Sequence, residues 1–137
     1  MHFTPDPNIQ TVAEAYALDA RDFFQQQFRV TLDWSDASIL SVETVMESMH
    51  RGLASARPTE EHVMNFAKLF GSYVGEVYRR RHGATWGIIE HDGQQFPGLQ
   101  ATGSGNLFWP WGRARNRLVE GADHNLWHYY SALIKPA

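Results

Sequence analysis

The chain has 137 residues, of which 43% are hydrophobic and 13% aromatic, enough to form one hydrophobic core. It contains no cysteine, which excludes disulfide frameworks, cysteine-ligated zinc or iron–sulfur sites and thiol nucleophiles. Twelve basic and fifteen acidic residues give a net charge of −3, too mild to indicate a nucleic-acid partner by itself. We therefore expect a single domain spanning residues 1–137.

The start of the sequence carries no visible targeting signal. Residues 1–8 hold two prolines, an aspartate and no lysine or arginine, and the residues that follow are amphipathic. Nowhere do about 18 apolar residues run together, as a membrane-spanning helix requires. These features predict a cytoplasmic protein without a membrane partner.

Charge is distributed unevenly along the chain. Residues 1–70 carry ten acids and five bases, a net charge of −5. Residues 71–137 carry five acids and seven bases, a net charge of +2, and six of these bases are arginines in two groups. Such an asymmetry points to a binding surface.

Two helices are predicted in the first 52 residues. Apolar residues recur at steps of three and four over residues 9–28, which is typical of an amphipathic helix. A second helix is expected to start at Asp36 or Ser38, since either side chain can cap a first turn. We expect it to run to about His50, with Gly52 ending it.

A third helix has clear signals at both ends. Thr59 can cap its first turn, which contains Glu60 and Glu61, and a basic run at 79–82 precedes Gly83. Acids at the start and bases at the end of a helix both interact favourably with its dipole. The pattern predicts a helix that ends at Gly83.

Beyond Gly83 the apolar residues alternate, as they do in strands. Strands are expected at 85–89, 94–96 and 107–109, with tight turns between them. Pro97 and the glycine after it should limit the pairing of the second strand.

The C-terminal part is expected to be helical again, with a short basic helix at 112–118 and a last helix capped by Asp123. The fold class predicted is α+β: two to three N-terminal helices, a small antiparallel three-stranded meander and a C-terminal helix.

Two glycines and a glutamate stand out within the third helix. Gly71 and Gly75 lie one turn apart, and each costs a helix about 1 kcal/mol relative to alanine. This indicates that a backbone or an aromatic ring packs closely against them. Glu76, if buried, needs an arginine partner, and could then be structural or a general base. We favour the structural interpretation.

No familiar catalytic motif is present. The chain lacks a Gly-x-Ser-x-Gly elbow, a dinucleotide fingerprint and a Walker loop. His124 and His128 are four residues apart, but Asn125 replaces the glutamate of zinc peptidases and no third ligand is near. We therefore expect no catalytic residue, no metal and no cofactor, and an enzyme built on Glu76 with either histidine ranks last.

Arginines and tryptophans suggest an alternative ligand surface. Arginines interleaved with aromatic residues can hold phosphates and stack on bases. The surface would comprise Arg79, Arg80, Arg81, Trp109, Arg113, Arg115 and Arg117. The competing interpretation, that these arginines pair with the acidic half of the same chain, is favoured by the net negative charge.

Several segments together resemble a group of small uncharacterised bacterial α+β proteins. In that group a helix with the pattern G-x-Y-x-G-E-V runs into a strand with G-x-x-W, and a basic helix and a tyrosine pair close the chain. The matching residues here are Gly71, Tyr73, Gly75, Glu76, Val77, Gly83, Trp86, Arg115, Arg117, Tyr129 and Tyr130. The resemblance implies a bacterial accessory domain without assigned activity, similar in kind to the immunity proteins encoded beside toxins.

Our leading hypothesis is a non-enzymatic protein-binding module, most specifically a bacterial immunity protein that neutralises a cognate toxin by direct binding. An acidic inhibitor surface associates rapidly with a basic partner. The interface is expected on acids of the first two helices, namely Asp19, Asp22, Glu43 and Glu47. The alternative is a small protein that binds nucleic acid or a phosphate ligand through the arginines and tryptophan named above.

Overall fold

The computed structural model describes residues 1–135 and confirms the α+β class. These residues form five α-helices, one short 3₁₀ helix and one four-stranded antiparallel sheet. In chain order the elements are β1 (His2–Pro5), α1 (Pro7–Phe28), α2 (Ser38–Ala56), α3 (Glu60–His82), β2 (Ala84–His91), β3 (Gln94–Ala101), β4 (Leu107–Phe108), α4 (Pro110–Glu120), η1 (Ala122–His124) and α5 (Leu126–Ile134).

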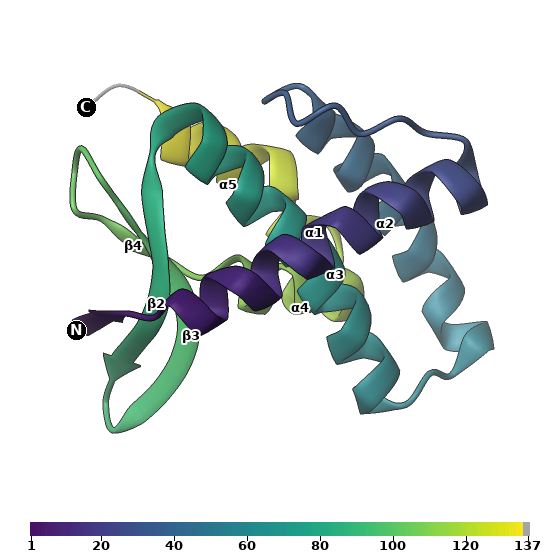
Figure 1. The fold of residues 1–137 in the computed structure, drawn as a ribbon. Helices are drawn as coiled ribbons and strands as arrows, with labels where there is room; N and C mark the ends of the chain where they lie inside the picture. The colour runs from purple at the N-terminus through teal and green to yellow at the C-terminus, as the bar shows by residue number, and fades with distance from the viewer. Residues whose placement is uncertain (136–137) are drawn as a thin grey trace.

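Helix α3 is the centre of the molecule. The sheet lies at one end of the molecule and α2 at the other (Figure 1). Helix α1 crosses one side of α3, and helices α4 and α5 cover the opposite side of α3. Every residue from Phe70 to Tyr78 is buried, so this half of α3 is enclosed all round. Helix α1 meets α3 through Ala13, Ala17 and Ala20, whose small side chains let the two helices approach closely.

The ends of α1 and α3 follow from local capping. The Asp6 carboxylate accepts a hydrogen bond from the Asn8 N–H at 2.9 Å, and Pro7 provides a preset first turn. The Thr59 hydroxyl accepts one from the His62 N–H at 3.2 Å, and α3 ends at Gly83, whose φ is +85°. The predicted bounds of the third helix are confirmed.

Helix α2 begins at Ser38, as predicted, but its cap and its C-terminal end differ from the sequence analysis. Neither Asp36 nor Ser38 caps it: the Asp36 carboxylate accepts a hydrogen bond from the Tyr130 hydroxyl, and the Ser38 hydroxyl bonds to Tyr73. The helix also continues past Gly52 to Ala56 and ends at Arg57, which has a left-handed conformation. Pro58 follows Arg57 directly. Because a residue before proline is disfavoured in helical geometry, Pro58 explains the end of α2 better than Gly52 does.

The sheet has four strands in the order β1-β2-β3-β4, so the predicted three-stranded meander lacked one. Strand β1 pairs along β2 from His2 opposite Glu90 to Pro5 opposite Gly87. Strand β3 continues through Pro97. Strand β4 pairs only with Leu99 and Gln100, so no strand lies beside Pro97 on the side away from β2, and the missing N–H of the proline is tolerated there.

The last helix is capped by Asn125, whose side chain accepts a hydrogen bond from the His128 N–H at 3.0 Å, and not by Asp123. Asp123 belongs instead to the 3₁₀ helix η1. Within residues 1–135, none of the helices combines the length and hydrophobicity that a membrane crossing requires.

Candidate binding surfaces

The four acids predicted to bind a partner divide into two pairs. Asp19 and Asp22 are exposed on α1, where Asp22 contacts only the neighbouring Arg21 at 3.2 Å. Glu43 and Glu47 on α2 instead point at Arg117 of α4. The expectation of an exposed acid at position 43 is wrong, since the Glu43 side chain is only 12% exposed, and Glu47 is half-buried.

A buried cluster around Arg117 connects helices α2, α4 and α5. The Arg117 side chain is 1% exposed, and its Nε and Nη2 atoms donate to the two oxygens of Glu43 at 2.8 and 2.7 Å. Nη2 also donates to Glu47 at 2.9 Å, and the Leu126 N–H at the start of α5 donates to Glu43. These contacts raise the pKa of Arg117 and make the cluster structural.

Glu76 forms a second buried ion pair, next to the sheet. It is fully buried, accepts hydrogen bonds from Arg79 at 2.6 and 2.9 Å, and accepts a third from the Trp86 indole at 2.9 Å. Burial raises its pKa, but the bonds from Arg79 and Trp86 outweigh burial and hold the pKa below its usual value. Glu76 is therefore buried beside an arginine, as the sequence analysis required of a buried carboxylate at this position.

The two glycines of α3 have the close neighbours that their spacing predicted. A Cβ atom at Gly71 would lie 2.7 Å from the Pro110 carbonyl oxygen, which belongs to the first turn of α4. One at Gly75 would lie 2.5 Å from the Trp86 ring. Gly71 therefore admits the backbone of α4, and Gly75 admits the indole that bonds to Glu76.

Most of the arginines in the alternative ligand surface have partners within the protein. Arg79 also contacts Glu14 at 3.4 Å, Arg80 lies 3.8 Å above the Trp34 ring, and Arg81 donates to the Trp34 carbonyl. Arg115 forms a two-bond pair with Glu60.

The two arginine groups also lie apart from each other. Arg115 pairs with Glu60 at the start of α3, whereas 79–81 lie near its end. At 1.5 Å per residue, these positions are roughly 28 Å apart along the helix. The structure therefore does not join the six arginines into one surface.

Arg113 and Trp109 line a cavity of about 330 Å³ between β4, α4 and α5. The Arg113 guanidinium lies 4.8 Å from the centre of the Tyr129 ring, and Trp109 is 38% exposed. The other lining residues are Leu107, Phe108, Asn116, Ala132 and Leu133. The sequence analysis named Arg113 and Trp109 but not the cavity residues of α5. Tyr129 fits the ordinary pattern of an amphipathic helix and gives no signal of a binding site.

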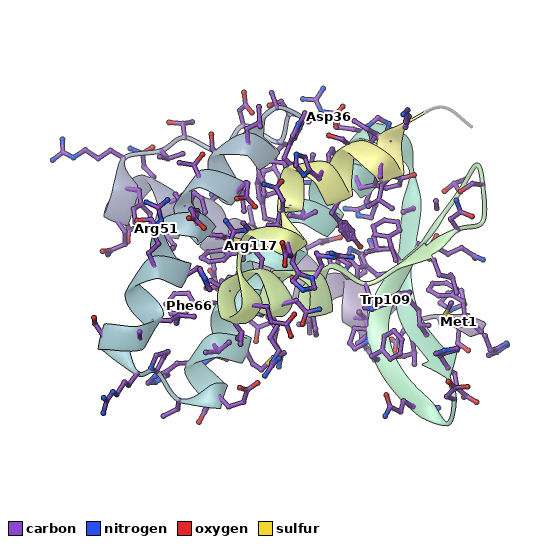
Figure 2. All side chains as sticks on the ribbon, turned by 180° about the vertical axis from the view of Figure 1, so that it is seen from behind. Met1, Asp36, Arg51, Phe66, Trp109 and Arg117 are labelled. Carbon is purple, nitrogen blue, oxygen red and sulfur yellow. The ribbon has the colours of Figure 1, made fainter. Side chains whose placement is uncertain are left out.

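A second, apolar cavity of about 240 Å³ opens where α2 turns into α3. We call it the α2–α3 groove, and it is lined by Met49, Gly52, Leu53, Ala56, Pro58, Val63, Phe66 and Leu118. Phe66 continues it toward α1, since its ring lies 5.6 Å from that of Phe23, which in turn lies 5.7 Å from Phe28. Phe66 and Trp109 lie on opposite sides of the molecule, with Arg117 between them (Figure 2).

The two histidines considered for a metal lie on different elements, His124 in η1 and His128 in α5. His124 contacts Glu120 at 2.5 Å and Arg113 at 3.3 Å. Residues 1–135 contain no group of three or more histidines and carboxylates placed to hold a metal ion.

The chain was compared with protein-family models, with curated proteins and with solved structures, and none of the three comparisons gave a match. The function is therefore argued from the geometry of these surfaces, and the resemblance to small bacterial proteins stays a prediction.

Proposed function

We propose that this protein is a non-enzymatic module that binds a basic partner protein and, most specifically, neutralises a toxin as an immunity protein does. The observation that supports this best is the α2–α3 groove. Its lining side chains are all apolar, and it lies open at the surface of the helical end. An open apolar groove can receive an apolar side chain of a partner protein.

The groove is matched in size to one large apolar side chain of the partner. A cavity of about 240 Å³ is at the small end for a ligand site, but it accommodates an aromatic or branched anchor. Burying such a side chain contributes about 1.5–3 kcal/mol. The rings of Phe23 and Phe28 extend the contact beyond the groove itself.

Exposed acids on α1 and α3 near this apolar surface favour a basic partner. Asp19 lies one helical turn before Phe23 on α1, so the two side chains are neighbours on the helix surface. Asp22 is also exposed, and Glu61 is exposed in the first turn of α3. Exposed acids combined with an apolar contact are the usual anatomy of an interface with a polar rim. They would speed the encounter with a basic protein.

The first experiment uses the chain as bait in lysate of its host, with two variants that alter the groove in different ways. Leu53→Glu places a charge in it, and Gly52→Trp fills its edge, where an added Cβ atom meets no atom within 4 Å. Leu40→Glu is the matched control, an exposed leucine of the same helix outside the groove. We expect one basic protein to be retained at high salt by the wild type and the control, and lost by both groove variants.

Retention of the same proteins by Leu53→Glu and Gly52→Trp would contradict the groove as the interface. The acids have a separate readout, because steering changes the association rate. Asp19→Asn with Asp22→Asn should slow association several-fold and weaken its salt dependence.

The inhibitory role is tested with the protein recovered. We expect its expression alone to arrest bacterial growth and co-expression of the wild-type chain to restore it. Leu53→Glu should fail to restore growth, while Leu40→Glu should succeed. A recovered partner that is harmless when expressed alone would refute the immunity function while leaving the binding role intact.

A further inference from the structure

Arg113 differs from the other arginines of α4 in having no carboxylate partner. Arg115 pairs with Glu60 and Arg117 with Glu43 and Glu47. Within residues 1–135, Arg113 forms no salt bridge, although it is half-buried. A guanidinium in such a position keeps its charge without a directly paired carboxylate.

Its neighbours hold this charge at the cavity between β4, α4 and α5. A guanidinium can only donate, so His124 accepts the Arg113 N–H at its Nδ1 atom, 3.3 Å away. The other ring nitrogen of His124, Nε2, lies 2.5 Å from the Glu120 carboxylate. On its other side the guanidinium rests against the Tyr129 ring. The side chain is therefore positioned without being neutralised.

The rest of the cavity is neutral and largely apolar. Asn116 and Tyr129 are the other polar side chains of its wall, and burial raises the pKa of the Tyr129 hydroxyl, which stays protonated at neutral pH. Trp109 provides an exposed aromatic surface, with Leu107 and Leu133 beside it. The cavity thus combines one positive charge, neutral hydrogen-bonding groups and a flat apolar wall.

We propose that this cavity binds a small organic carboxylate with a planar apolar body, whose carboxylate pairs with Arg113 and whose ring packs on Trp109. A volume of about 330 Å³ holds a one-ring or two-ring acid. One guanidinium balances a single negative charge, and Glu120 behind His124 disfavours a dianion. The site is separate from the α2–α3 groove and does not depend on the protein partner.

The test titrates the full chain with benzoate and with indole-3-acetate while ¹H–¹⁵N spectra are recorded. We expect shifts of the Trp109 indole and of residues 107–116 and 129–133. Neutral benzamide should bind at least about tenfold more weakly, because it lacks the charge that Arg113 recognises. Phenyl phosphate tests the dianion, and it should bind more weakly than benzoate.

Variants assign the binding to the cavity. Arg113→Met should weaken binding of both carboxylates about tenfold or more, and Arg115→Met should leave it unchanged. Ala132→Trp blocks the cavity from an exposed position and keeps the test valid if the first variant fails to fold. Three results would each overturn the proposal: no shift from either carboxylate at about 10 mM, equal affinity for benzamide, or tighter binding of phenyl phosphate.

Discussion

The two cavities beside α4 have opposite chemistry although one helix contributes to both. The α2–α3 groove contains Leu118 and has no polar side chain in its wall. The cavity at the sheet side contains Arg113 and Asn116 of the same helix, with aromatic rings around them. Arg117 lies between the two regions and is neutralised by Glu43 and Glu47.

This difference shows how pairing separates structural arginines from candidate binding arginines. All three arginines of α4 lie within five residues, so their spacing cannot distinguish them. Their partners do, because Arg115 and Arg117 each form salt bridges and Arg113 is held by an imidazole and a ring. A surface that looked continuous in sequence therefore divides into a structural part and a cavity.

The largest effect on stability is expected from removing Arg117, which lies between the two cavities. Arg117→Met leaves the largely buried Glu43 without its counterion, whereas Glu47 keeps Arg51, and should destabilise the protein by about 3–5 kcal/mol. Urea denaturation measures this, with Arg115→Met as the control in an exposed pair. Equal midpoints for the two variants would mean that the buried cluster is not structural.

The second-largest effect on stability is expected from the packing at the start of α4. This packing positions the wall of the Arg113 cavity but not that of the α2–α3 groove. Gly71→Ala forces a methyl group against the Pro110 backbone and should cost about 1–3 kcal/mol. Gly52→Ala meets open space and should stabilise the helix by about 0.4–1 kcal/mol. Thermal unfolding of both variants checks the opposite signs, and a stable Gly71→Ala protein would refute the close packing.

Lowering the pH should remove the stabilising contribution of Glu76, which lines neither cavity. The pKa of Glu76 is lower in the folded protein than the unfolded value of about 4.3. Its contribution to stability is therefore fully present above that pH and is lost as the pH falls through the folded pKa. The stability difference between wild type and Glu76→Gln should shrink as the pH falls below about 4.3, and a difference independent of pH would contradict this.

The smallest effect on stability is expected at Arg113. Because it forms no salt bridge, Arg113→Met should change the free energy of unfolding by no more than about 0.5 kcal/mol. Urea denaturation beside Arg117→Met makes the contrast within one helix. A loss comparable to that of Arg117→Met would show that Arg113 is structural and that the two regions do not differ in this respect.

Much of the fold could be predicted from local signals. The threonine before α3, the glycine after it and the change of apolar period beyond it located that helix and the hairpin. Strand β1 could not be predicted, since its four residues depend on pairing with β2 across more than eighty positions. Likewise, Gly52 resembled a helix end, but Pro58 decided where α2 stops.

The candidate sites were less predictable because partners distant in sequence decide them. The close packing at Gly71 and Gly75 followed from the cost of glycine in a helix, and the arginine beside Glu76 from the cost of a buried charge. Glu43 read as an exposed acid until Arg117, 74 positions later, was found beside it. The groove residues Leu53 and Phe66 belong to the apolar stripes of their helices, and an apolar stripe does not show which of its members are covered.

The proposed partner interface is tested most directly by hydrogen–deuterium exchange on the purified complex. We predict slower exchange at residues 49–66, which include most of the groove, and at 19–28 of α1, with 107–116 and 129–133 unchanged. Protection confined to 107–116 and 129–133 would contradict the account and would move the protein interface to the cavity of Arg113.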